Sequence, residues 1–99
     1  MGKKVLYFIS CEDDTGIELA TEHADDDDIT ILLIQNAVYF ANKSNKIMAQ
    51  ALGKNRRVAA CKEDIEIRGL SNYISDKVEL VSSAEIIDIV FENDNIVNM

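Results

Sequence analysis

The chain has 99 residues and a mass of 11.1 kDa, which predicts a single domain over residues 1–99. Hydrophobic residues make up 47% and charged residues 28%, a composition too apolar for a disordered chain. A net charge of −8 argues against direct binding to nucleic acid, because basic residues supply the affinity for phosphates. No apolar run approaches the roughly 20 residues that span a bilayer, so we expect no membrane insertion and a cytoplasmic location.

Four short, apolar and β-branched runs predict β-strands. The first two are continuously apolar, as is typical of parallel strands that are buried on both faces. Helix signals separate the runs, and the resulting β-α alternation predicts an open α/β sheet with right-handed crossovers. The polar tail after residue 92 offers a short additional strand. The four predicted strands are Lys4–Ile9, Ile29–Ile34, Arg57–Cys61 and Val78–Val81.

Two capping boxes predict where the first and last helices begin. Thr15 is followed three residues later by Glu18, and Ser82 is followed by Glu85. In a capping box the hydroxyl and the carboxylate each accept a hydrogen bond from an otherwise unpaired backbone N–H.

The middle of the chain predicts two shorter helical stretches. Asn36 is a candidate cap for residues 37–41, and the pattern resumes over residues 47–52. Gly53 and Gly69 stand where helices should end, because glycine adopts the left-handed conformation without steric cost.

Several features that suggest binding sites are better explained as surface structure. The Asp25–Asp28 run lacks the ligand spacing of a calcium loop and is predicted to be a solvated turn. His23, near the end of the first helix, is interpreted as a surface residue, and the cluster Lys54–Arg57 is the main concentration of positive charge. Two cysteines and one histidine are too few for a zinc site, and the common nucleotide loops are absent. We therefore expect no metal and no cofactor.

Candidate functional residues gather at one edge of the predicted sheet. In open parallel sheets, functional groups lie beyond the carboxyl ends of the strands, where loops and helix N-termini converge. Both cysteines should therefore lie on the same edge. The four strands deliver to it Ser10-Cys11, Gln35-Asn36, Cys61-Lys62 and Ser82-Ser83.

Cys61 is the main candidate for chemistry. It precedes the predicted helix Lys62–Arg68, whose N-terminus would favour a thiolate, as would the charge of Lys62. Glu63 and Asp64 oppose that effect, because nearby negative charge raises the pKa of a thiol. The residues alone leave the net direction open, together with the alternative that Cys61 is a small buried hydrophobic residue.

Cys11 is a weaker candidate, since the acidic residues 12–14 follow it. A phosphate-accepting cysteine loop needs converging N–H groups and a cation, and three carboxylates would repel the substrate. A receiver-type magnesium site is also disfavoured, because it needs an aspartate where Cys61 stands.

Two segments resemble a known family. Residues 31–41, ILLIQNAVYFA, are similar to the LLxQNGVxxA segment of the DsrH/TusB branch of the DsrE/DsrF/DsrH sulfur-relay family, with Ala37 in place of the usual glycine. Residues 58–71, VAACKEDIEIRGLS, resemble the VYxLxxDxxARGL segment of that branch. The resemblance spans most of the chain and implies a three-layer α/β/α sandwich with a mostly parallel sheet of four or five strands.

The resemblance also implies a function. Such proteins pass protein-bound sulfur toward 2-thiouridine in tRNA wobble positions or act in sulfur oxidation. The implied partners are DsrE-family subunits in a homo- or hetero-oligomer, together with sulfur donor and acceptor proteins. In the sister DsrE/TusD branch the sulfur-carrying cysteine ends the third strand, before a helix that ends in Arg-Gly. Cys61 and the pair Arg68-Gly69 match those positions, although the DsrH/TusB branch often lacks this cysteine.

Three hypotheses follow. In the first, Cys61 transiently holds persulfide sulfur, with Cys11, Gln35, Asn36 and Lys62 lining the site. Gln35 and Asn36 would supply hydrogen-bond donors to the anion, unless they serve only as a loop contact and a helix cap. In the second, the chain is a non-catalytic subunit with inert cysteines, so whether it is an enzyme stays open. In the third, the two cysteines form a redox pair, which requires α-carbons within about 7 Å.

The Arg-Gly pair also carries a structural expectation. Arg68 lies four residues after Asp64, which predicts an ion pair along one side of the helix worth roughly 0.2–0.5 kcal/mol. We interpret Arg68 as a structural residue rather than a catalytic one.

Overall fold

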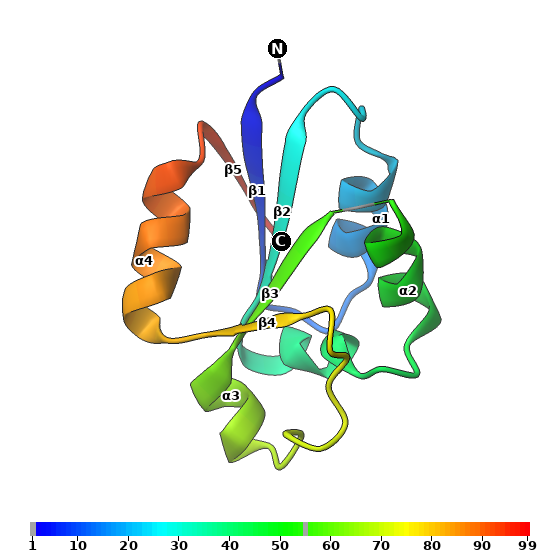
Figure 1. Cartoon of the computed structure of the whole chain (residues 1–99), viewed down its shortest axis with the longest axis vertical. Coiled ribbons are helices and arrows are strands. Elements are labelled where there is room, and N and C mark those ends of the chain that lie inside the picture. Colours follow the sequence, from blue (N-terminus) through cyan, green and yellow to red (C-terminus); the bar gives the residue numbers. More distant parts are fainter. Residues whose placement is uncertain (1, 55) are drawn as a thin grey trace.

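The computed structural model describes residues 2–54 and 56–99. Five strands alternate with four α-helices and one 3₁₀ helix, here called η1, as the sequence predicts for an α/β protein (Figure 1). In chain order the elements are β1 (Lys4–Ile9), α1 (Thr15–Glu22), β2 (Asp28–Leu33), η1 (Gln35–Ala41), α2 (Lys46–Gly53), β3 (Arg57–Cys61), α3 (Lys62–Ile67), β4 (Glu79–Val81), α4 (Ser83–Glu92) and β5 (Asn95–Asn98).

The strands form one parallel sheet in the order β4-β3-β2-β1-β5. The polar tail supplies the fifth strand, β5, which pairs with β1 at the edge of the sheet. Two strands differ slightly in extent from their predicted runs, since β2 lies at 28–33 and β4 at 79–81. Among the described residues, no helix has the length and apolar character needed to cross a membrane.

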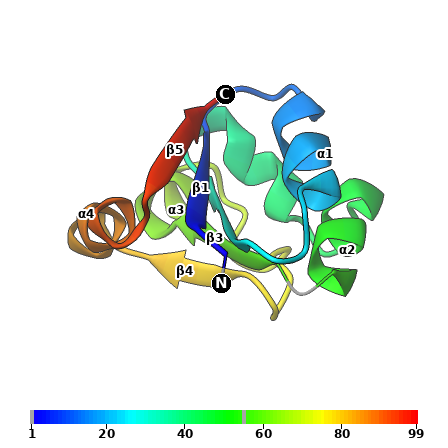
Figure 2. The same cartoon turned by 90° about the horizontal axis from the view of Figure 1, so that it is seen from above.

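Alternation along the strands gives the sheet two apolar faces. One face packs the larger cluster, which includes Val5, Ile31 and Val58, beneath α1, η1 and α2. The opposite face packs Leu6, Leu32 and Ala59 beneath α4. Figure 2 shows α1 and α2 on one side of the sheet and α4 on the other, the three layers that the family resemblance implies.

The two predicted capping boxes have different outcomes. The box at the start of α4 is present: the Ser82 hydroxyl accepts from the Glu85 N–H, and the Glu85 carboxylate accepts from the Ser82 N–H. The box at Thr15 is wrong. Thr15 donates both its N–H and its hydroxyl to the carboxylate of Asp13, and Asp14 is the N-cap of α1. The acidic residues before the helix outcompete the threonine because a carboxylate accepts two hydrogen bonds at once.

The predicted cap at Asn36 is also wrong. Ile34 precedes η1, and Asn45 caps α2 by accepting from the Met48 N–H at 2.9 Å. Gly53 and Gly69 both lie near helix ends, as predicted. Of these two glycines, only Gly69 has a positive φ, +66°. Gly53 is the last residue of α2 and keeps a negative φ.

Candidate functional site at the carboxyl edge of the sheet

The carboxyl edge brings both cysteines to the same side of the sheet, as predicted. Cys11 follows β1 and is exposed, whereas Cys61 is the last residue of β3 and is buried. β2 lies between the two strands, so their axes are about 10 Å apart. This spacing exceeds the limit for a disulfide and opposes the redox-pair hypothesis.

Cys61 lies on the sheet face that α4 covers, here called the less covered face because a single helix packs on it. It is in register with Val81 of β4. It is the N-cap of the six-residue helix α3, but its side chain makes no capping hydrogen bond. Only 8% of its surface is exposed. Burial is the main cause that raises the pKa of the thiol, and the Asp64 carboxylate adds to the rise; the backbone amides of Asp64 and Glu63 oppose it. The sequence left open whether the pKa of the Cys61 thiol is raised or lowered. In the structure it is raised, which favours the neutral thiol.

The two segments that carry the family resemblance are held together by a hydrogen-bonded network. The Gln35 N–H donates to Asp64 Oδ2 at 2.8 Å, and Arg68 Nη2 donates to Asn36 Oδ1 at 3.0 Å. Arg68 also pairs with Asp64 at 3.4 Å, which confirms the predicted contact along the helix. The start of η1 is thereby fixed against α3, directly beyond Cys61.

Gln35 takes part in this network through its backbone N–H, and Asn36 through its side-chain carbonyl. Gln35 has a φ of +51°, a conformation that costs a non-glycine residue roughly 1–2 kcal/mol. The bond from its N–H to Asp64 holds that conformation in place. Sequence reasoning did not identify Asp64 as the partner of Gln35, because the two residues are 29 positions apart.

The remaining predicted site residues lie on the surface. Lys62 is the first residue of α3 and is exposed, as is Cys11. The Ser83 hydroxyl donates to Glu63 Oε1 at 3.4 Å and so joins the start of α4 to α3. Within residues 2–54 and 56–99, no group of three or more His, Cys, Asp and Glu could hold a metal ion.

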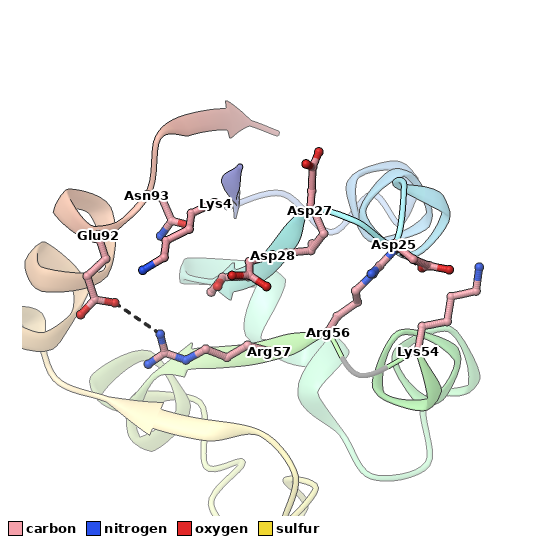
Figure 3. A pocket seen from close by; sticks show the side chains of 11 residues that line it. Lys4, Asp25, Asp27, Asp28, Lys54, Arg56, Arg57, Glu92 and Asn93 are labelled. Atoms are coloured by element: carbon pink, nitrogen blue, oxygen red, sulfur yellow. Dashed lines mark ion pairs between the residues drawn. The ribbon is translucent and has the colours of Figure 1, made fainter. Parts of the chain in front are cut away.

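A cavity lies at the opposite edge of the sheet, where the strands begin (Figure 3). Its volume is about 630 Å³. Arg57 reaches across it to Glu92 at 3.6 Å and also pairs with Glu79 of the neighbouring strand β4 at 3.0 Å. The charged and polar residues that line the cavity include Lys4, Asp25, Asp27, Asp28, Thr30, Lys54, Arg56, Arg57, Glu92 and Asn93.

Arg56, although it belongs to the basic cluster, is turned into the protein. It is 7% exposed, and its guanidinium donates to the carbonyl oxygens of Ala20, Thr21 and His23 at the end of α1. A cation there satisfies carbonyl groups that the helix leaves unpaired. Asn55, the second residue of the predicted cluster, lies outside the described residues. The only sequence signal for this role was an arginine pair in a strongly acidic chain.

The interpretation of His23 as a surface residue is wrong. Its ring lies between the Tyr7 hydroxyl, 2.8 Å from Nδ1, and the Asp27 carboxylate, 2.7 Å from Nε2. Asp27 also accepts from the Lys3 N–H at 2.9 Å, so it is not part of a merely solvated turn. The hydrogen bond from His23 is the main cause that lowers the pKa of Asp27.

The five-stranded parallel sheet between helical layers places the chain in the class of small α/β proteins. Comparison with known proteins identifies the family. Residues 10–96 match the family described as DsrH like protein. The chain therefore belongs to the DsrH branch of the DsrE/DsrF/DsrH sulfur-relay family.

Two curated relatives carry the name Protein TusB. The protein from Cronobacter sakazakii is 33% identical and that from Photorhabdus laumondii is 31% identical, each over 63 residues. The aligned segment is 64% of this chain and 66% of each relative, just under two thirds of the relatives' length.

Solved structures share the fold across nearly the whole chain. The ychN protein from E. coli has a TM-score of 0.82 at 20% identity and is covered completely, as is this chain. MTH1491 from Methanobacterium thermoautotrophicum has a TM-score of 0.79 at 15% identity, covering 98% of this chain and 99% of that protein. At these identities the likeness establishes the fold alone.

Proposed function

We propose that this chain is a supporting subunit of a sulfur relay that serves 2-thiouridine synthesis at tRNA wobble positions. Membership of the DsrH family supports the relay, and the relatives named TusB favour the tRNA route over sulfur oxidation. In this proposal its partners are DsrE-family subunits and, through them, a sulfur donor and an acceptor protein. The chain works in the cytoplasm.

The state of Cys61 is the observation that favours a supporting role over a carrier role. Sulfur transfer requires a thiolate that attacks the outer sulfur of a donor persulfide. The Cys61 side chain is 8% exposed, and burial raises the pKa of its thiol. Both properties slow such an attack. Cys11 is exposed, but three acidic residues follow it and no arginine is in that loop.

A second candidate function is that Cys61 carries sulfur itself once a partner is bound. The observation in its favour is the position of the thiol at the N-terminus of α3, where the amides of Glu63 and Asp64 favour the thiolate. In that reaction Cys61 loses its proton, and the sulfur atom attacks the outer sulfur of the donor persulfide. The donor cysteine leaves as a thiolate and takes up a proton, which leaves a persulfide on Cys61.

Loading with labelled sulfur distinguishes the two functions. The chain is incubated with a persulfide-loaded cysteine sulfurtransferase, alone and together with its DsrE-family subunits, and the intact mass of each chain is measured. For a supporting subunit, sulfur appears on a DsrE-family chain and not on this one. Sulfur on this chain that is lost in Cys61→Ser and kept in Cys11→Ser would establish the carrier role instead.

A reconstituted tRNA thiolation assay tests the relay itself. Omission of this chain should lower 2-thiouridine formation, and the Cys61→Ser protein should restore it fully if the role is supporting. Unchanged 2-thiouridine formation without the chain would refute both functions.

A further inference from the structure

The C-terminal quarter of the chain is uniformly acidic. From Val78 to Met99 the sequence contains five carboxylates and no Lys, Arg or His. This segment forms β4, α4 and β5, the helix and the two edge strands of the less covered face. The five residues are Glu79, Glu85, Asp88, Glu92 and Asp94.

The same segment exposes large apolar side chains. Phe91 is 84% exposed and Ile87 is 56% exposed. They are four residues apart on α4, so they lie on the same side of the helix. Ile96 of β5, on the sheet face that α4 covers, is 42% exposed. We call these three residues the C-terminal surface.

The fold itself does not use the C-terminal surface. The side chains that pack α4 against the sheet are Ile86, Ile89 and Val90. A single helix covers this face, whereas α1, η1 and α2 cover the other (Figure 2). Exposed apolar patches mark protein–protein contacts, and aromatic residues such as Phe are enriched in the cores of those contacts.

Charge selects the kind of partner. In a symmetric contact between two copies of this chain, the same acidic segment would face itself, and like charges oppose association. A different chain with an apolar groove rimmed by Lys and Arg would match both the apolar residues and the surrounding carboxylates. We propose that the C-terminal surface docks such a chain. The choice of a DsrE-family subunit as that chain rests on the function proposed above.

Asp88 is the clearest test of the charge. Glu79 and Glu92 pair with Arg57, Glu85 completes the capping box, and Asp94 accepts from the Lys4 N–H. Asp88, next to Ile87 on α4, makes none of the described hydrogen bonds or ion pairs. Its replacement therefore changes the charge of the surface without removing a contact of the fold.

The experiment measures binding of the purified chain to each DsrE-family subunit encoded in the same genome. We expect Phe91→Ser to weaken binding at least about tenfold, as for a central aromatic contact. We expect Asp88→Lys to slow association about tenfold, and the unchanged protein to associate more slowly as salt screens the charges. Leu19→Ser, a change at a 47% exposed residue of α1, is the matched control and should leave binding unchanged.

Each alternative outcome overturns the proposal in a recognisable way. Binding that survives Phe91→Ser and Asp88→Lys would leave the relay intact and refute the C-terminal surface. A dimer of this chain alone, dissolved by Phe91→Ser in sedimentation, would identify a second copy as the occupant. Failure of every DsrE-family subunit to bind would refute both the surface and the proposed partners. Circular dichroism verifies that each variant is folded.

Discussion

The backbone N–H of Gln35 donates a 2.8 Å hydrogen bond to the carboxylate of Asp64. Gln35 has a φ of +51° at the end of β2, and Asp64 belongs to the first turn of α3, which follows Cys61. The Asp64 carboxylate thus accepts a hydrogen bond from the one non-glycine residue with a positive φ in the described chain. The bond couples the two segments that carry the family resemblance.

Replacement of Asp64 should weaken this coupling. Asp64→Asn removes the charge that serves both Gln35 and Arg68, so we expect a loss of about 1–2 kcal/mol in the free energy of unfolding. Urea denaturation measures the loss. Glu66→Gln, an exposed change in the same helix, is the control and should have little effect. An equal loss in both variants would mean that the Gln35 contact contributes nothing.

The left-handed conformation of Gln35 makes a separate prediction. Gln35→Gly should be neutral or stabilise the protein by up to about 1 kcal/mol, because glycine adopts positive φ without steric cost. Gln35→Val should destabilise it by more than about 1 kcal/mol, because a β-branched side chain is strained there. Thermal unfolding of the two variants measures the difference. Stability that follows the reverse order would contradict the observed conformation.

Arg56 and Arg57 are neighbours with opposite expected effects. Arg56→Met leaves three carbonyl groups at the end of α1 without their donor, so we expect a loss of about 2–3 kcal/mol. Arg57→Met removes exposed ion pairs with Glu79 and Glu92 and should cost at most about 1 kcal/mol. Denaturant unfolding of both variants provides the comparison. Similar losses would show that Arg56 is not a structural cap.

Acid stability should depend on Asp27. Its pKa is lowered in the folded protein, chiefly by the hydrogen bond from His23, so its stabilising effect is complete above the unfolded pKa and is lost as the pH falls. The unchanged protein should therefore lose stability below about pH 4 more steeply than Asp27→Asn. Melting temperatures measured from about pH 5 downward test this slope. Asp26→Asn, the control, makes the same charge change at the preceding residue. This variant should still lose stability steeply as the pH falls.

The two thiols should react at different rates. Cys11 is exposed, whereas Cys61 is buried, and burial raises the pKa of its thiol above that of a free cysteine. At neutral pH we expect iodoacetamide to modify Cys11 first, with Cys61 reacting slowly and accelerating as the pH rises. Peptide mass spectrometry separates the two sites, and Cys11→Ser isolates the Cys61 rate. Rapid modification of Cys61 at neutral pH would favour the carrier function.

The sequence predicted the architecture because short-range patterns encode it. Continuous apolar runs such as Lys4–Ile9 identified buried parallel strands, and the Ser82 capping box marked the start of α4. Both signals lie within a few residues of chain. Where two local signals competed, as at Thr15 and Asp13, the sequence pattern favoured the wrong residue.

The candidate site was predicted only in its location. The carboxyl edge and the two cysteines followed from the strand ends, because parallel strands all end on one side. The direction of the Cys61 pKa shift could not be predicted from the strand ends, because it depends on burial by distant segments. His23 and Arg56 likewise gained their roles from residues far along the chain.

By itself, the sequence determined the α/β class, the order of the elements, the family and the acidic character of the C-terminal segment. The tertiary structure decided which polar groups meet: Gln35 with Asp64, Arg56 with the end of α1, and His23 with Tyr7 and Asp27. The physical reason is that helix and strand formation depend on residues a few positions apart. Burial, hydrogen bonds between distant segments and thiol ionisation depend on the space that the whole chain encloses.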